Sequence, residues 1–420
     1  MPVAADSAAL RAAIRDHFQP DPPACLGVAV SGGSDSLALL ALLAAWADET
    51  GAPALHVVTV DHGLRPESGD EAAYVGQISA QMGLPHTILK WEGWDGHGNL
   101  ADRARRARYD LMAQWAGAQG IHDIALGHTR DDQAETLLMR LARQAGLDGL
   151  AGMSARHRRG DLILHRPLLA HSREALRAHL RAGGIRWVED PSNSDATYRR
   201  VQARRALNAL RDVGITAEGL AQVAHHLAEA RATLAQYAVE EARKITRFHS
   251  GDLVLERPAL RALSPDITRR ILQAGLKWVS GAEYGARGRA VDQAIAALHS
   301  GTNTTLQGCR ITLRRDTLRI SREPAAVVHL TAPPDQVWDG RWRLAGPGGS
   351  DGIIRALGAA GRAACPDWRV TGLPATSIEA SPALWHGDTL VAAPVAGLGN
   401  GWSAVLCRDE GDFYNTLLSH

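Results

Sequence analysis

The residues best suited to chemistry lie in one short segment, Ser31-Gly-Gly-Ser-Asp-Ser36. The apolar run before it, 26–30, predicts a buried strand, and an apolar helix is expected from 37 to 46. A glycine turn between a strand and a helix N-terminus forms an anion site, because unpaired N–H groups and the helix dipole point at it. The segment therefore predicts a site for nucleotide phosphates; the alternative is an ordinary strand-to-helix turn with a Ser or Asp cap.

The residue types in this segment suit different parts of such a ligand. Gly32 and Gly33 let the backbone approach a phosphate, and the three serines add hydroxyl donors. Asp35 is a carboxylate where anions bind, so we expect it to hold Mg²⁺ rather than phosphate directly. The segment has neither the ending of a Walker loop nor the spaced glycines of a dinucleotide fold. The residues expected to bind the nucleotide here are Ser31, Gly32, Gly33, Ser34, Asp35 and Ser36.

A second polar cluster follows the predicted strand 123–126 and opens a helix. Asp132 and Glu135 are three residues apart, so they share one face of that helix. Together with His128 and Asp131 they could bind Mg²⁺ or an amine, and we favour this interpretation because the same sheet edge carries the phosphate loop. The alternative is that the carboxylates only complement the helix dipole.

Two further clusters precede it in the chain. Asp61 and His62 end the predicted strand 55–60, where recognition of adenine and ribose would suit them; a plain strand-ending turn is the alternative. Arg105 and Arg108 lie three apart on a predicted helix, so their guanidiniums could clamp a triphosphate or RNA phosphates. For this pair the alternative is a solvated basic helix surface.

The stretch 154–211 is strongly basic, with thirteen arginines against five acidic residues. A polar loop within it, beginning at Trp187, could order on RNA, with Arg and Tyr side chains meeting phosphates and bases. An interdomain linker with a helix cap is the alternative. The residues expected to contact RNA are Tyr198, Arg199, Arg200, Arg204 and Arg205.

The elements that must position these clusters alternate along the first half of the chain. Continuous apolar runs predict buried strands, and helical spacing predicts the helices between them. The strands are expected at 26–30, 55–60, 87–91 and 123–126, and the helices at 37–46, 71–82, 100–118 and 131–145. This alternation predicts an α/β fold with a doubly wound parallel sheet, whose sites lie at the carboxyl ends of the strands.

The second half of the chain has a different pattern. Helical spacing begins near residue 217, a second helix is expected from Ser264-Pro265 and a third over 289–299. Alternation over 309–321 predicts a hairpin, 324–334 suits a linker, and the Trp-, Gly- and Pro-rich end predicts a small, mostly β domain. We therefore expect a catalytic domain at 1–212, a mainly helical domain at 213–325 and a small C-terminal domain at 335–420.

Composition limits the classes of function. The 420 residues carry a net charge of +1, so any nucleic-acid surface must be local. The four cysteines lie far apart without a Cys-x-x-Cys pair, which argues against a zinc ribbon or an iron–sulfur site and fits a reducing cytoplasm. No segment has the length of a membrane span or the apolar core of a signal peptide, so we expect a cytoplasmic protein with no membrane partner.

These clusters, in this order, resemble those of the tRNA(Ile)-lysidine synthetases, a family of N-type ATP pyrophosphatases with the PP-loop fold of the adenine nucleotide alpha hydrolases. The matching runs are 31–36, 61–65, 99–109, 131–136, 166–169, 189–193 and 198–200. The phosphate loop and the Asp-Asp-x-x-Glu-Thr run are shared with related families, whereas Asp-His-Gly-Leu-Arg and Glu-Asp-x-Ser-Asn are more specific. The likeness is strong over about the first 210 residues and thinner afterwards.

The resemblance implies a ligase that modifies an isoleucine tRNA with a CAU anticodon, using ATP, Mg²⁺ and free L-lysine. The wobble cytidine would be adenylated, and lysine would then replace AMP. By resemblance, the loop 31–36, Asp61 and His62 would bind ATP, Arg65, Arg105 and Arg108 would hold phosphate or the base, and His128, Asp131, Asp132 and Glu135 would serve lysine. The basic stretch and the later domains would grip the tRNA, the last one discriminating among tRNAs, and a homodimer is an open alternative to a monomer.

The chain departs from the family pattern at two positions: Val201 stands where Asn is usual, and Ala209 where Pro is usual. Three rival functions are a tRNA thiolase of the same fold, a small-molecule ligase making NAD or GMP, and an RNA-binding protein without activity. A thiolase would need a cysteine pair, which this chain lacks. A small-molecule ligase would not need the basic stretch, and ATP turnover would exclude the third.

Overall fold

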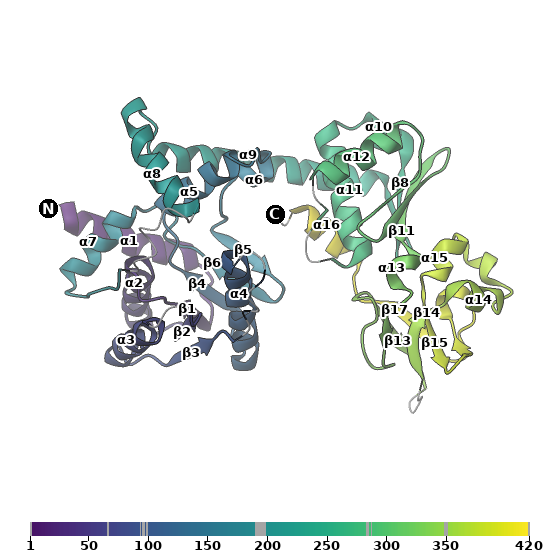
Figure 1. The fold of residues 1–420 in the computed structure, drawn as a ribbon, viewed down its shortest axis with the longest axis horizontal. Helices are drawn as coiled ribbons and strands as arrows, with labels where there is room; N and C mark the ends of the chain where they lie inside the picture. Colours follow the sequence, from purple (N-terminus) through teal and green to yellow (C-terminus); the bar gives the residue numbers. More distant parts are fainter. Residues whose placement is uncertain are drawn as a thin grey trace. The chain divides into compact units, whose positions relative to one another are not determined.

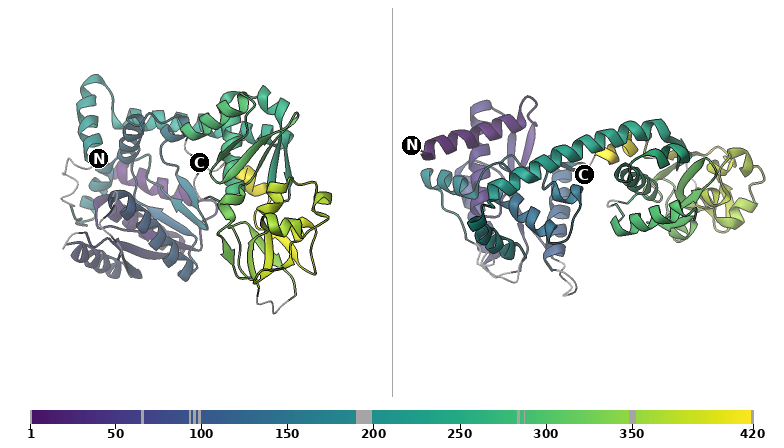
Figure 2. Two further views of the ribbon diagram at one scale, coloured as in Figure 1. Left: turned by 45° about the vertical axis from the view of Figure 1, so that its right-hand side comes forward. Right: turned by 90° about the horizontal axis from the view of Figure 1, so that it is seen from above.

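The computed structural model describes residues 2–64, 67–92, 94, 97, 100–189, 199–282, 285–286, 288–347 and 352–418. The chain divides into two compact units, Met1–Arg231 and Ala232–His420. The division falls within helix α9 (Ala217–Ile245), which is conspicuous in Figure 2. The three-domain division expected from the sequence stays a prediction. Among the described residues, no helix combines the length and apolar character needed to cross a membrane.

A six-stranded sheet with the order β3-β2-β1-β4-β6-β5 lies at the centre of the first unit (Figure 1). Its strands are β1 (Cys25–Ala29), β2 (Ala54–Asp61), β3 (His86–Lys90), β4 (Asp123–Leu126), β5 (Arg156–Arg159) and β6 (Leu162–His165). All neighbouring strands are parallel except β5, which runs antiparallel to β6. The predicted doubly wound parallel sheet is confirmed, and each of the four predicted strands lies within one or two residues of its expected position.

Helices pack on both faces of this sheet. The helices of this unit are α1 (Pro2–Phe18), α2 (Ser34–Thr50), α3 (Ser68–Gln81), α4 (Leu100–Gln119), α5 (Arg130–Leu141), α6 (Leu147–Leu150), α7 (Arg173–Ala182) and α8 (Arg199–Leu210). Because successive side chains of a strand point to opposite faces, Leu26 and Val28 of β1 enter the core formed with α1, α2 and α7. Ala29 borders the other core, which α4 covers with Met112 and Trp115. Burial on both faces explains why the central strands β1, β2 and β4 are rich in apolar residues.

The strand order places the functional edge. From β1 the chain proceeds to β2 and β3 on one side, then returns to β4 on the other side of β1. The topological switch point therefore lies between β1 and β4, and ligands of open α/β sheets bind outside the carboxyl ends of strands at such a point. These two strands are followed by the turn 30–33, which together with the first residues of α2 contains the phosphate loop 31–36, and by the turn 127–129.

The second unit contains antiparallel sheets and helices. A five-stranded sheet has the order β7-β8-β11-β10-β9, and four-stranded and two-stranded sheets have the orders β12-β14-β15-β16 and β13-β17. The strands are β7 (Thr246–His249), β8 (Asp252–Glu256), β9 (Thr304–Leu306), β10 (Cys309–Leu313), β11 (Thr317–Arg322), β12 (Thr331–Ala332), β13 (Trp342–Ala345), β14 (Ile353–Ala356), β15 (Pro382–His386), β16 (Thr389–Ala392) and β17 (Ser403–Leu406). The helices are α10 (Arg257–Ala262), α11 (Pro265–Ser280), α12 (Gly288–His299), α13 (Pro324–Val327), α14 (Gly358–Ala363), α15 (Ala375–Glu379) and α16 (Glu410–Leu418).

Sequence patterns predicted this unit less completely. The hairpin is confirmed by β10 and β11, which pair Leu313 with Leu318, and the two later helices by α11 and α12. The short strands β7, β8 and β9 were not predicted from the sequence. The prediction of a linker at 324–334 was wrong, because α13 and β12 form there and Val327 is fully buried.

A buried histidine pair joins α1 to the sheet. Nε2 of His17 lies 2.9 Å from Nδ1 of His165, whose Nε2 lies 2.8 Å from Oδ1 of Asp123. Burial lowers the pKa of His17 to about 4, and the charges of His165 and Arg156 add to this effect. Burial also lowers the pKa of His165. Between pH 4 and 6.5 the unfolded chain binds more protons at these positions than the folded chain does.

We therefore expect the free energy of unfolding to be highest above pH 6.5 and to decrease toward pH 4. Because His17 is only half-buried, solvent screening reduces the effect of its shift, and we expect a loss on the order of 1 kcal/mol between pH 8 and pH 5. Urea unfolding at the two pH values measures it, and His17→Gln, which cannot titrate, should show a smaller loss. An equal loss in this variant would show that other groups cause the acid sensitivity.

Candidate active site

The loop after β1 is held in a conformation that leaves backbone donors for a ligand. Gly32 has a φ of +84°, in the left-handed region that glycine adopts without strain. The Ser36 hydroxyl accepts a hydrogen bond from the Ser31 N–H at 3.1 Å and donates one to the Gly33 carbonyl at 3.0 Å. No side chain caps the N-terminus of α2. Its first N–H groups and the helix dipole therefore suit an anion.

The end of β4 lies directly against this loop. A β-carbon at Gly127 would lie 2.8 Å from the carbonyl oxygen of Asp35 and 2.9 Å from Cα of Ser36. Real β-carbons essentially never approach backbone atoms this closely, so the glycine permits the first turn of α2 and the end of β4 to meet. The phosphate loop and the second polar cluster thus form one site.

We expect Gly127→Ala to displace the first turn of α2, because both clashing groups are backbone. Overpacking of this kind costs about 1–3 kcal/mol in stability, and the distorted loop should bind ATP at least about tenfold more weakly. Calorimetric titration with ATP and thermal unfolding measure both effects. Gly117→Ala in α4 is the control, since its β-carbon would meet nothing within 4 Å. Wild-type ATP affinity in Gly127→Ala would refute the role given to this contact.

The acidic pair of α5 is positioned by a capping box. Thr129 caps the helix, its N–H donating to Oδ2 of Asp132 at 2.8 Å, while its hydroxyl accepts from the Asp132 N–H at 3.4 Å. Asp132 is 5% exposed and Glu135 is fully buried. Helical spacing turns both carboxylates to the same side, as predicted.

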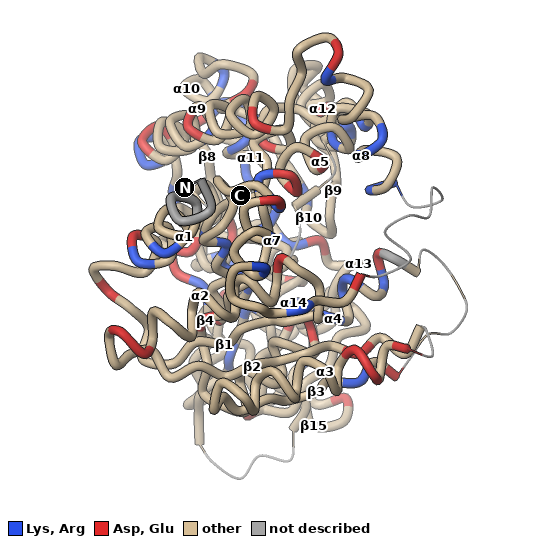
Figure 3. Tube along the Cα trace, turned by 90° about the vertical axis from the view of Figure 1, so that its left-hand side faces the viewer, with Lys and Arg blue, Asp and Glu red and all other residues tan. Residues whose placement is uncertain are grey.

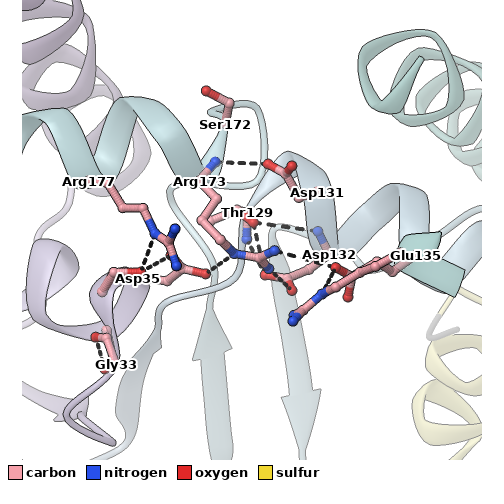
Figure 4. Close-up of polar contacts among 12 residues, drawn as sticks. Gly33, Asp35, Thr129, Asp131, Asp132, Glu135, Ser172, Arg173 and Arg177 are labelled. Carbon is pink, nitrogen blue, oxygen red and sulfur yellow. Dashed lines mark hydrogen bonds and ion pairs between the residues drawn. The ribbon is translucent and has the colours of Figure 1, made fainter. Parts of the chain in front are cut away.

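The guanidiniums of Arg173, Arg200 and Arg204 surround this pair. Figure 4 shows Arg173 beside Asp132 and Glu135. Arg173 Nη2 lies 2.9 Å from Oδ1 of Asp132, and its Nη1 lies 3.4 Å from Oε1 of Glu135. Arg200 reaches the same two carboxylates at 3.1 and 2.7 Å, and Arg204 reaches Glu135 at 2.5 Å. Although burial raises the pKa of Asp132, the charges of Arg200 and Arg173 lower it overall. The same carboxylates raise the pKa of Arg173 against the effect of its burial.

Arg173 also connects the acidic pair to the phosphate loop. Its Nε donates to Oδ2 of Asp35 at 2.9 Å, and its backbone N–H donates to Oδ2 of Asp131 at 2.8 Å. The Ser34 hydroxyl donates to the other carboxylate oxygen of Asp35 at 3.0 Å. Burial raises the pKa of Asp35, and Arg173 opposes that rise. Arg173 thus links four acids, Asp35 in the first turn of α2 and the three acids Asp131, Asp132 and Glu135 of α5.

His128 lies beside these groups as a neutral imidazole. Burial lowers its pKa to about 3; the charges of Arg166 and Arg108 act in the same direction, and that of Asp132 opposes them. Its Nδ1 is buried and has no hydrogen-bond partner among the described residues. His128 can therefore accept or donate one hydrogen bond to a ligand without first losing a proton.

A cavity of about 570 Å³ joins these parts. It is lined by Ser31, Gly33, Ser34, Asp35, Ser36, Gly127, His128, Asp132, Arg173, Arg177, Trp187, Val188, Glu189, Arg200 and Arg204. The lining combines the phosphate loop after β1 with the groups after β4, as expected for a site at the switch point. Its volume lies within the range of small-molecule sites. None of the four cysteines lines it.

The other predicted residues lie around this cavity or outside the described chain. Asp61 ends β2, and His62 follows it; neither lines the cavity, and burial lowers the pKa of His62. The guanidiniums of Arg105 and Arg108 each lie 5.3 Å from the ring of Tyr109. Arg199 and Arg205 are exposed on α8, whose arginine-rich sequence is visible in Figure 3. Arg65 and Tyr198, and the run 190–193, lie outside the described residues.

Sequence reasoning missed Arg173 and Arg177. Both were counted only as part of a basic stretch expected to bind RNA. A signal was present, since Ser172 is a suitable helix cap and arginines at its first and fifth following positions share one helix face. The acids that these arginines meet, however, come from distant parts of the sequence.

Among the described residues, no group of three or more His, Cys, Asp and Glu side chains is arranged to hold a metal ion. Mg²⁺ is often bound by one or two carboxylates together with substrate phosphates. Asp35 is a single carboxylate of the phosphate loop, so it suits Mg²⁺ that is bound jointly by the protein and by substrate phosphates.

The chain matches one family model and several curated relatives in sequence. Residues 7–210 match the family model of the PP-loop domain. A tRNA(Ile)-lysidine synthase from Ruegeria pomeroyi is 51% identical over 407 residues, covering 97% of each chain. One from a Bradyrhizobium species is 37% identical, over 71% of this chain and 90% of the relative. Among solved structures, a U34-tRNA thiolase from Methanococcus maripaludis aligns with 54% of this chain and 80% of its own, with 14% identity and a TM-score of 0.48.

Proposed function

This chain belongs to the tRNA(Ile)-lysidine synthase family, and on that premise we propose how its residues form lysidine on tRNA(Ile). One observation supports the proposal above all: a single cavity joins a phosphate loop to a buried acidic pair. The first feature suits ATP and the second suits a substrate ammonium. The remaining substrates are free L-lysine and the wobble cytidine of a CAU anticodon.

In the first step, the cytidine carbonyl oxygen attacks the α-phosphorus of ATP. The bond from that phosphorus to the bridging oxygen breaks, and pyrophosphate leaves with the electron pair. The N–H groups of the loop 31–36 and the N-terminus of α2 hold the β- and γ-phosphates. Asp35 holds Mg²⁺, which offsets negative charge on the phosphates when bound. Arg105 and Arg108 stabilise phosphate or hold the base.

In the second step, the ε-amine of lysine attacks the ring carbon that bears the adenylate, and AMP leaves with the electron pair of the broken bond. Asp132 and Glu135 bind the ammonium and one of them, or His128, accepts the proton that the attacking amine must lose. Since three arginines occupy these carboxylates, the ammonium has to replace at least one guanidinium. We expect the ammonium to displace Arg200 or Arg204, both of which come from α8.

The proposed tRNA contacts involve residues that do not line the cavity. Arg199, Arg205 and Tyr198 are proposed to contact tRNA, and residues 335–420 to discriminate among tRNAs. Binding through arginines to phosphates should weaken with salt. A homodimer and a cytoplasmic location stay predictions.

The test uses purified protein, ATP, Mg²⁺ and radiolabelled lysine. We expect label in an isoleucine tRNA transcript with a CAU anticodon, only when ATP is present, and none in a methionine tRNA. Pyrophosphate release on addition of tRNA without incorporation of lysine would retain the adenylating activity and refute lysine as the nucleophile.

A further inference from the structure

The phosphate loop of this protein contains no positive charge of its own. The segment 30–36 has neither Lys nor Arg, whereas the departing pyrophosphate carries several negative charges. Backbone N–H groups and a helix dipole supply only partial charges. Full positive charges to balance the pyrophosphate must therefore come from outside this segment. Arg173 and Arg177 of α7 line the cavity and can supply two of them.

The arginine pair of α7 faces the loop. Arg177 Nε lies 3.4 Å from the Ser34 hydroxyl, and Arg173 Nε lies 2.9 Å from the Asp35 carboxylate. Because the two arginines are four residues apart, they share one face of α7. Figure 4 shows both side chains extending from that helix toward Asp35. Each guanidinium thus lies beside a residue of the phosphate loop.

The helix that carries the pair is firmly held. The Ser172 hydroxyl caps it by accepting from the Ala175 N–H at 3.2 Å, and Asp131 accepts from the Arg173 N–H. Leu176 and Leu180 are fully buried against α1 and α2. The cations are therefore presented by a packed element and not by a loop, which reduces the entropy lost when a ligand binds.

Arg173 and Arg177 differ in how strongly acidic neighbours hold them. Arg173 is engaged by Asp35, Asp132 and Glu135, all within 3.4 Å. The side chain of Arg177 is 33% exposed, and its acidic neighbour is the exposed Glu189 at 3.5 Å. A phosphate would therefore compete with a weak partner at Arg177 and with a strong network at Arg173. Guanidiniums bind phosphate oxygens in a bidentate, charge-assisted manner.

We propose that Arg173 and Arg177 form the cationic half of the pyrophosphate site, facing the loop 31–36 across the cavity. They bind the β- and γ-phosphates of ATP and neutralise the negative charge that develops on the leaving pyrophosphate. When the Arg173 guanidinium turns to a phosphate, it releases the Asp35 carboxylate. This inference deepens the proposed function and rests on it for the identity of the nucleotide.

Arg177→Gln is the decisive variant, because Arg177 touches the loop but neither Asp132 nor Glu135. We expect its Kd for pyrophosphate with Mg²⁺, measured by calorimetric titration, to increase by about tenfold or more. The KM for ATP should increase with it, while the KM for lysine stays unchanged. Arg177→Lys keeps the charge and should recover part of the affinity.

Arg181→Gln is the matched control on the next turn of α7. Its guanidinium pairs with Glu174 at 2.8 Å and does not line the cavity, so its pyrophosphate affinity should equal that of the wild type. Arg173→Gln should weaken both pyrophosphate and lysine, because Arg173 contacts both halves of the site. Thermal unfolding of each variant separates lost binding from lost folding.

The outcomes distinguish this inference from the proposed function. Wild-type pyrophosphate affinity in Arg177→Gln, or an equal loss in Arg181→Gln, refutes the role of α7 even if lysine enters tRNA(Ile). Conversely, a loss confined to Arg177→Gln and Arg173→Gln supports the phosphate site even if the protein fails to incorporate lysine. If pyrophosphate affinity is lost only in these two variants and no lysine is incorporated, lysine is the wrong substrate but the phosphate site is supported.

Discussion

Glu135→Gln is expected to reduce lysine incorporation into tRNA(Ile) by about 10²–10⁴-fold while largely sparing adenylation of the cytidine. Glutamine keeps the shape of the side chain but removes the negative charge that would bind the ammonium or accept its proton. Adenylation depends on the phosphate loop, which the Glu135 carboxylate does not contact directly. ATP–pyrophosphate exchange in the presence of tRNA measures the first step, and transfer of radiolabelled lysine measures both.

The charge balance of the cluster requires a stability control for this variant. Glu135 is fully buried and contacts three arginines, so neutralising it leaves positive charge poorly compensated. Loss of one partner from a buried ion pair costs about 3–5 kcal/mol. Thermal unfolding must therefore show that the variant is folded at the assay temperature, with Glu174→Gln on the surface of α7 as the neutral comparison. Equal losses of adenylation and transfer would contradict a role specific to lysine.

Local pattern was sufficient to predict the turn between β1 and α2 and the shared helix face of the acidic pair. A strand, two glycines and a helix N-terminus are adjacent in sequence, so their arrangement could be predicted before the fold was known. Asp132 and Glu135 share a helix face for the same local reason. The sequence departures at Val201 and Ala209 also acquire a physical context, because α8 continues through both positions and buries Val201.

The partners of these groups could not be predicted, because strand order is not a local property. Once β4 lies beside β1, residues after β4 enter the cavity, whereas Asp61, at the end of β2, lies on the other side of β1 and does not line it. The same principle applies to charge. Arginines at 173, 200 and 204 read as part of an RNA-binding stretch, yet in the fold their guanidiniums meet buried carboxylates. A run of charged residues in a sequence indicates the sign of the local charge, but it does not identify the groups that these side chains contact in the fold.

Asp35→Asn is expected to abolish both steps, lowering pyrophosphate release and lysine incorporation together by about 10³-fold or more. The reason is the position of Asp35, which lies in the first turn of α2 beside the phosphate loop and binds Arg173. Without its charge, the Mg²⁺ that we propose for this site would lose its protein ligand, and Arg173 would lose the partner that links the loop to α5. Asparagine keeps the volume of the side chain, so the fold should survive.

The comparison of Asp35→Asn with Glu135→Gln separates the two halves of the cavity. If the acids act in sequence, the first variant stops adenylation and every later event, whereas the second stops only transfer. Asp35→Asn should also weaken the Mg²⁺ dependence of ATP binding, which titration at several Mg²⁺ concentrations measures. Pyrophosphate release at the wild-type rate on addition of tRNA to Asp35→Asn would mean that another residue holds the metal. The phosphate loop would then act through its backbone and the arginines of α7 without Asp35.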